Sequence, residues 1–116
     1  MLIQPYAQSA IPHAHYGENM VIGVGYVTLH IFESHSLKDK RRVVRSLVER
    51  ARQRFNASVA EVDHLDSWQV AGIGFACVSN SGAHADRMLA EIVKFIESNA
   101  AFGALADVST ELIHID

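Results

Sequence analysis

Residues 20–32, MVIGVGYVTLHIF, place the strongest constraint on the fold. The stretch is rich in Val, Ile and aromatic residues and contains no Asp, Glu, Lys or Arg, which is typical of a β-strand. Odd-numbered positions from Val21 to Ile31 and even-numbered positions from Ile22 to Phe32 are both largely apolar. A strand with two apolar faces needs cover on both of them, so we expect it at the centre of a sheet.

Residues 36–55 are predicted to form a helix. Ser36 suits the N-cap position, and Asp39 three residues later completes a weak capping box. Apolar residues recur at helical spacing and are expected to face the core. They are Leu37, Val44, Leu47, Val48, Ala51 and Phe55.

The remaining segments predict two strands, a helix and a last strand, at residues 57–64, 68–79, 83–99 and 107–115. The short turn LDS joins the first two of these strands into a hairpin. The order β-α-β-β-α-β predicts an α+β fold, the ferredoxin-like plait. Right-handed crossovers then place both helices on one face of a four-stranded antiparallel sheet with the spatial order 4-1-3-2.

The length fits a single domain over residues 20–116, preceded by an irregular extension over residues 1–19 that holds both prolines. His13 and His15 in this extension are expected to be solvated, and we predict neither a metal nor a cofactor. We expect no membrane span and no secretory signal. Since Cys77 is also expected to be a buried, reduced thiol, the cytoplasm is the predicted location.

The basic residues are concentrated in the predicted first helix. The chain has a net charge of −3, yet eight of its ten Lys and Arg residues lie between Lys38 and Arg54. Cations in the first two helical turns, such as Lys38 and Lys40, oppose the helix dipole, so helix stability alone does not account for them. Together with the free N–H groups of the first turn they predict a phosphate site. The residues expected to bind RNA phosphates are Lys38, Arg41, Arg42, Arg45 and Arg52.

The first predicted function is therefore non-catalytic binding of RNA or of a ribosomal particle, with binding that weakens steeply as salt rises. A solvated helical face whose cations pair with acidic residues elsewhere in the chain is the open alternative. A base-stacking platform like that of RNA-recognition domains is a poor match, because the usual basic start of the third-strand motif is missing.

A second candidate site arises from the topology, which brings the stretches ESHSLK and DHLDSW to the same end of the sheet. Its residues are His35, Ser36, Asp63, His64, Asp66 and Trp68. These residue types suit a small anionic ligand or acid–base chemistry, but no catalytic motif accompanies them, and we lean against an enzyme. Asp63 with His64 is more typical of a stabilised turn, and Trp68 is expected to be a packing anchor for the hairpin, with ligand stacking as the other option.

The outer face of the sheet, away from the helices, carries a third prediction. Ile22, Val24, Tyr26 and Phe32 would leave an apolar patch exposed on a monomer. A homodimer that packs sheet against sheet is the simplest cover, and the N-terminal extension is another. A dimeric protein-interaction adaptor is accordingly a further alternative function.

The stretches SLKDKRRVVRSL and VAEVDHLDSWQ, within residues 20–116, resemble the YlxP-like family of small bacterial proteins. The resemblance implies a domain of unknown function with a ferredoxin-like fold. It also implies a gene that in several bacteria lies beside genes for translation initiation and ribosome-maturation factors, which is compatible with a role near RNA. No catalytic residues are implied, and the segment before Met20 lies outside the resemblance.

Overall fold

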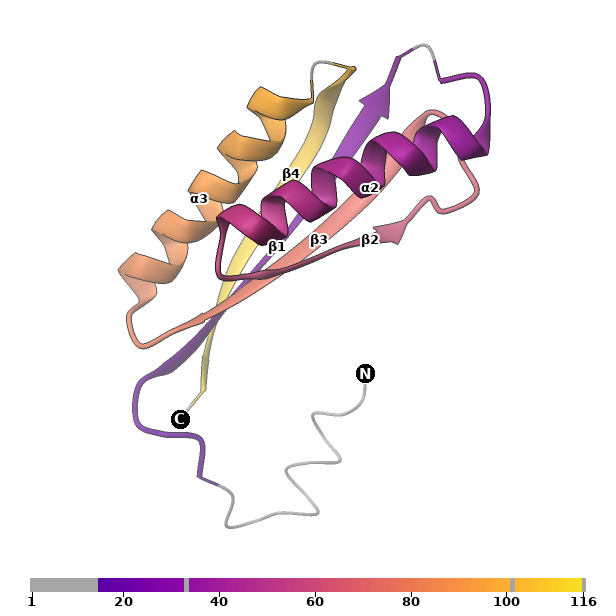
Figure 1. Ribbon diagram of the computed structural model, residues 1–116. Helices are drawn as coiled ribbons and strands as arrows, with labels where there is room; N and C mark the ends of the chain where they lie inside the picture. Colours follow the sequence, from indigo (N-terminus) through magenta and orange to yellow (C-terminus); the bar gives the residue numbers. More distant parts are fainter. Residues whose placement is uncertain (1–14, 33, 101, 116) are drawn as a thin grey trace.

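The computed structural model describes residues 15–32, 34–100 and 102–115, which form one four-stranded sheet and two helices (Figure 1). The elements are β1 (Met20–Ile31), α2 (Leu37–Arg54), β2 (Ser58–Asp63), β3 (Val70–Ser79), α3 (Gly82–Asn99) and β4 (Gly103–Ile115). The strands pair in the order β2-β3-β1-β4, all antiparallel. The predicted ferredoxin-like plait and its strand order 4-1-3-2 are confirmed.

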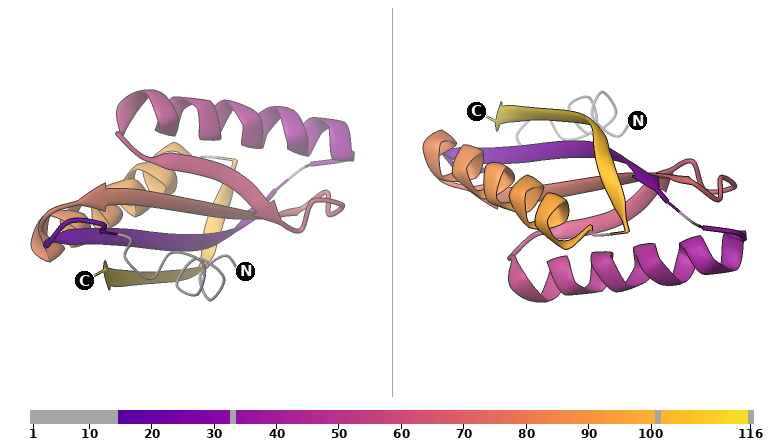
Figure 2. Two further views of the ribbon diagram at one scale, coloured as in Figure 1. Left: turned by 90° about the horizontal axis from the view of Figure 1, so that it is seen from below. Right: turned by 90° about the horizontal axis from the view of Figure 1, so that it is seen from above.

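The core lies between the sheet and the two helices, which cross the same face of the sheet (Figures 1 and 2). Val27 and Leu29 of β1 are fully buried on this side, and Ile73 of β3, opposite Val27, is buried as well. Leu47 of α2 and Ile92 of α3 close the core from the helix side. The central position predicted for the first strand is therefore confirmed, since β1 pairs on both edges.

The strand boundaries differ from the prediction most at β4, which begins at Gly103 and therefore earlier than expected. A register shift after Thr28 of β1 leaves Ala106 outside the pairing. This bulge and the alanines around it interrupt the apolar alternation, so the sequence pattern did not show the first residues of the strand. Gly103 itself is required there, because a Cβ would overlap the carbonyl oxygen of His30.

The N-terminal extension was predicted to be irregular over residues 1–19. Residues 1–14, and with them His13, lie outside the described residues, whereas residues 15–19 form neither helix nor strand. His15 is exposed. None of the helices that the structure describes is both long enough and apolar enough to cross a membrane.

Cys77 and Phe75 of β3 both lie on the core side of the sheet. Cys77 is a free thiol with 3% of its surface exposed, as predicted. Phe75 is 4% exposed and faces the helices, so it offers no stacking surface on the outer face. Gly25 of β1 lies directly opposite Phe75, and a Cβ at Gly25 would overlap the aromatic ring. The ring therefore covers bare backbone at this position.

We expect Gly25→Ala to lower the free energy of unfolding by ~1–3 kcal/mol, because the added methyl group forces the Phe75 ring out of its position. In a Phe75→Leu background the same substitution should cost less than ~1 kcal/mol, since the clashing ring is gone. Urea unfolding of the four proteins of this cycle gives the coupling. Equal costs of Gly25→Ala in the two backgrounds would contradict the packing described here.

Candidate functional site

The N-terminus of α2 is fixed by a serine cap. The Ser36 hydroxyl accepts a hydrogen bond from the Asp39 backbone N–H at 3.0 Å, which confirms the predicted N-cap. The Ser36 carbonyl accepts from the backbone N–H of Lys40 at 3.2 Å and from the hydroxyl of Ser34 at 3.2 Å. Ser34 is itself buried, and its hydrogen bond to Ser36 restrains the loop that leads into the helix.

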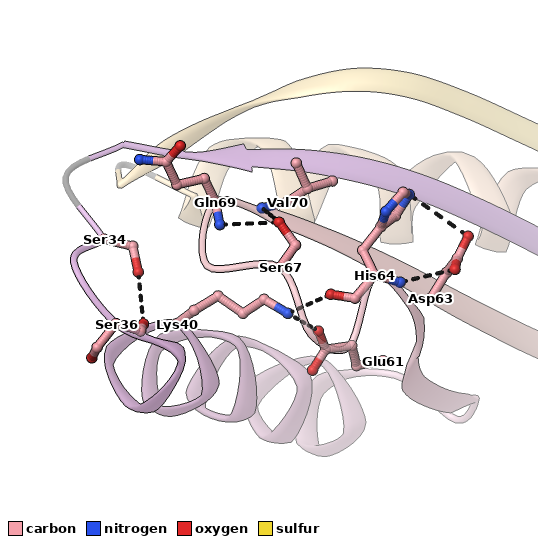
Figure 3. A network of polar contacts seen from close by, with 9 residues as sticks. All are labelled: Ser34, Ser36, Lys40, Glu61, Asp63, His64, Ser67, Gln69 and Val70. Atoms are coloured by element: carbon pink, nitrogen blue, oxygen red, sulfur yellow. Dashed lines mark hydrogen bonds and ion pairs between the residues drawn. The ribbon is translucent and has the colours of Figure 1, made fainter.

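Lys40 is fully buried, although the sequence placed it among the exposed cations of the first two turns. Its Nζ donates to Glu61 Oε2 at 2.6 Å and to the carbonyl oxygen of His64 at 2.9 Å (Figure 3). The side chain of Glu61 remains 17% exposed. Lys40 therefore joins α2 to β2 and to the turn of the β2–β3 hairpin, and its assignment to a phosphate site is wrong.

A spacing signal for Lys40 was present in the sequence. Lys40 precedes Val44 by four residues and Leu47 by seven, so it lies on the apolar stripe of the helix rather than on its solvated flank. Glu61 follows the buried Val59 by two residues in a strand and so points to the same side of the sheet. An acid and a base on two core-facing positions predict a buried ion pair.

The hairpin turn is held by local hydrogen bonds. The His64 carbonyl also accepts from the Ser67 backbone N–H at 3.0 Å, and His64 has a left-handed backbone with φ of 58°. The Ser67 hydroxyl accepts from the N–H groups of Gln69 at 3.3 Å and Val70 at 3.1 Å (Figure 3). The polar groups of this turn therefore support its backbone.

The acid–base residues of the second candidate site do not converge on a common ligand position, and the contacts of Asp63 are made within and beside this turn. Asp63 Oδ1 accepts from the His64 backbone N–H at 2.8 Å, and Asp63 Oδ2 lies 3.6 Å from His64 Nε2. The hydroxyl of Tyr26, on the outer sheet face, lies 3.4 Å from Asp63 Oδ2. His35 and Asp66 are exposed. The topology does bring the start of α2 and the hairpin together as predicted, but the contact is made by Lys40 and Glu61.

Trp68 differs most from its expected role. It lies in the turn before β3 and is 53% exposed, so the prediction that it anchors the hairpin by packing is wrong. The predicted strand began at Trp68, whereas β3 begins at Val70.

Three arginines of α2 lie together on the side of the helix that faces β2. Arg41, Arg45 and Arg52, called the arginine strip from here on, line a groove of about 480 Å³ between α2 and β2. Arg52 Nε donates to the carbonyl oxygen of Val59 at 2.8 Å, which places its guanidinium along the edge of β2. The other lining residues are Val44, Val48, Glu49 and Glu61.

The remaining cations of α2 have other positions. Arg50 Nη1 donates to Asn99 Oδ1 at 3.2 Å, and the Arg54 guanidinium lies 5.7 Å from the centre of the Phe95 ring, so both reach toward α3. Arg42 Nη2 lies 3.8 Å from Asp39 Oδ1 in an exposed pair, which contributes little to stability. Lys38 is exposed.

Ion pairing is sparse around the predicted phosphate-binding residues. Within the described part of the chain, Arg42 pairs with Asp39, but no acid lies within 4.0 Å of Lys38 or of the arginine strip. Pairing with acidic residues elsewhere in the chain therefore accounts for Lys40 but not for the strip. Glu49 and Glu61 do line the same groove, but the charge of Glu61 is already balanced by Lys40.

Comparison with known proteins identifies a family model and a relative that match this chain. A family model described as "Protein of unknown function (DUF503)" matches residues 22–109. The uncharacterized protein YlxP of Bacillus subtilis (strain 168) is 33% identical over 78 residues, which cover 67% of this chain and 85% of the relative. The family match spans α2, the hairpin and therefore the whole site.

Two solved structures of designed proteins also align with the chain. De novo designed protein Foldit4 has a TM-score of 0.48 and 13% identity, with coverage of 81% of this chain and 96% of its own. De novo designed protein Ferredog-Diesel has a TM-score of 0.46 and 12% identity, with coverage of 85% and 91%.

We expect Lys40→Met to lower the free energy of unfolding by ~2–4 kcal/mol, because it leaves the Glu61 carboxylate and the His64 carbonyl without their donor. Adding Glu61→Leu should recover most of this stability, since an apolar pair can replace a buried ion pair. Lys38→Met, at an exposed position of the same turn, is the matched control and should change stability by less than ~0.5 kcal/mol. Urea unfolding measures all three, and equal effects of the two lysine substitutions would refute a structural role for Lys40.

Proposed function

The chain belongs to the DUF503 family, a family of unknown function, and we propose that it is a non-catalytic protein that binds RNA through α2. The observation that carries the proposal is the arginine strip, whose three guanidinium groups share one groove and have no acidic partner within 4.0 Å among the described residues. Guanidinium groups bind phosphate with paired hydrogen bonds and are weakly hydrated, which suits them to a polyanion.

The geometry of the strip favours an extended ligand over a single small anion. Arg41 and Arg52 are eleven residues apart in one helix, which at 1.5 Å per residue separates them by roughly 16 Å along the helix axis. That length corresponds to several phosphates of a nucleic-acid strand. Lys38 and Arg42 are exposed near the start of the helix and add positive charge there.

We prefer RNA as the partner because the family resemblance implies a gene that lies beside genes for translation initiation and ribosome-maturation factors. A ribosomal particle or its precursor is accordingly the finer form of the proposal. Co-sedimentation with ribosomal subunits at low salt separates this form from binding to free RNA.

The first test measures the affinity for a single-stranded RNA oligonucleotide over a series of salt concentrations. We expect Arg41→Gln with Arg45→Gln to weaken binding and to reduce the slope of log K against log salt by about 1.4, roughly 0.7 for each phosphate that is no longer neutralised. Fluorescence anisotropy of an end-labelled oligonucleotide gives both quantities.

The matched control is Arg50→Gln with Arg54→Gln, which removes the same charge from the same helix on the side that reaches toward α3. This control should leave the salt slope within about 0.3 of the wild-type value, less than half of the change expected for one phosphate. Equal effects of the two double variants would show that net charge alone attracts the RNA, and the role of the strip would be rejected.

The outer face of the sheet supports a second partner, another copy of the chain. Ile22 lies in register between Ile113 of β4 and Val78 of β3, and the outer two are 40% and 65% exposed. In the next row, Val24 lies between Ala76 of β3 and Glu111 of β4. We propose that the apolar side chains of this face pack against their equivalents in a homodimer, since exposed apolar surfaces commonly mark protein interfaces.

Val78→Lys should convert a dimer to a monomer, because it places a charge within the proposed interface. Val108→Lys is the matched control, since Val108 is 48% exposed but pairs with Val27 on the helix-facing side of the sheet. Light scattering coupled to size-exclusion chromatography reports the masses. A wild-type chain that runs as a monomer at every concentration would rule out this interface.

A further inference from the structure

The hairpin turn exposes large apolar side chains at the end of the sheet where α2 begins. Trp68 is 53% exposed, and Leu65 of the same turn is 53% exposed. Phe32, at the end of β1, is 57% exposed. Ile31 donates its backbone N–H to the Gln69 carbonyl at 2.8 Å. Phe32, which follows Ile31, and Trp68, which precedes Gln69, therefore lie at the same end of the fold.

The backbone that carries Trp68 is held firmly. The residues on both sides of it are tied down, Ser67 through its N–H to the His64 carbonyl and Gln69 through its N–H to the Ser67 hydroxyl. The His64 carbonyl is held in turn by the buried Nζ of Lys40. An aromatic side chain presented to solvent from a fixed turn gives up little conformational freedom when it stacks on a ligand.

The arginine strip begins where this turn is attached to the helix. Arg41 directly follows Lys40, and Lys40 reaches the carbonyl of His64, only four residues before Trp68. Arg41 therefore lies on the helical turn that contacts the hairpin, and a strand that runs along the strip and continues past Arg41 leaves the helix at the end of the fold that carries this turn.

The charges of the turn determine which part of a nucleotide fits there. Asp63 and Asp66 are exposed on the hairpin and repel phosphates. An uncharged base is not repelled, and carboxylates accept hydrogen bonds from the amino groups of bases. The strip thus favours the phosphates and the hairpin favours a base.

We propose that Trp68 stacks against an unpaired base of a single RNA strand whose phosphates lie along the arginine strip. Base-on-aromatic stacking tolerates any sequence, since every base has a flat apolar face. The inference rests on the proposed RNA-binding function and specifies it, because it selects single-stranded over double-stranded RNA.

Trp68 is the only tryptophan of the chain, so intrinsic fluorescence reports on this residue alone. The probes are a 12-nucleotide oligouridylate and an abasic oligonucleotide with the same number of phosphates, each titrated at low salt. We expect the oligouridylate to quench the Trp68 emission in a saturable manner and the abasic strand to quench it little. A duplex of the same length should bind without quenching.

The affinity of variants for the oligouridylate provides the second readout. Trp68→Ala should weaken binding by roughly 5- to 160-fold, which corresponds to the ~1–3 kcal/mol lost when a stacking aromatic residue is replaced by alanine, with an unchanged salt slope because every phosphate stays bound. Trp68→Phe should stay within about threefold of wild type, since a stacking ring remains. Leu65→Ala is the matched control, as it removes an equally exposed apolar side chain without a π-face, and should have no effect.

The outcomes separate this inference from the function on which it rests. Salt-dependent binding that neither quenches Trp68 nor responds to Trp68→Ala would overturn base stacking and leave RNA binding by the strip intact. Equal quenching by the abasic strand would also overturn it, because the signal would then not come from a base. No binding of any strand would reject both proposals.

Discussion

The contact on which the rest of this site depends is the buried amino group of Lys40. Burial of a charge without partners costs several kcal/mol, and here the cost is offset by the Glu61 carboxylate at 2.6 Å and the His64 carbonyl at 2.9 Å. Those partners belong to β2 and to the hairpin turn, so a single side chain joins α2 to both. The groove between α2 and β2, and the end of the sheet that carries Trp68, depend on this contact.

The same contact explains why the eight basic residues between Lys38 and Arg54 are not equivalent. Lys40 serves the fold, and Arg50 and Arg54 reach toward α3. The arginine strip is left on the flank that faces β2, in a chain whose net charge is −3. A local concentration of positive charge on an acidic protein directs a polyanion to one surface and repels it from the others.

Much of the fold was predictable because hydrophobic periodicity identifies helices and strands directly, and the element order then leaves few topologies. The start of β4 was missed because the bulge at Ala106 breaks that periodicity. In the site, Arg41, Arg45 and Arg52 do share one flank, whereas Arg42 pairs with Asp39 and does not line the groove. Lys40 and Trp68 were misjudged for a common reason. Residue type suggested a solvated lysine and a buried tryptophan. A core-facing carboxylate keeps the lysine buried, and a position in the turn before β3 leaves the tryptophan exposed.

The two proposed interfaces lie on different sides of the molecule and are compatible with each other. The outer face of β1 and β3 points away from the helices, so two copies stacked through it would keep both α2 helices in solvent. Such a dimer would present two arginine strips, and simultaneous contact of both with one RNA would raise the overall affinity through effective concentration alone. The contact at 3.4 Å between Tyr26, on the outer face, and Asp63, at the hairpin, links the two surfaces directly. Packing a second copy over Tyr26 would therefore restrain the same hairpin that presents Trp68, so dimerisation and base stacking would act on one structural element.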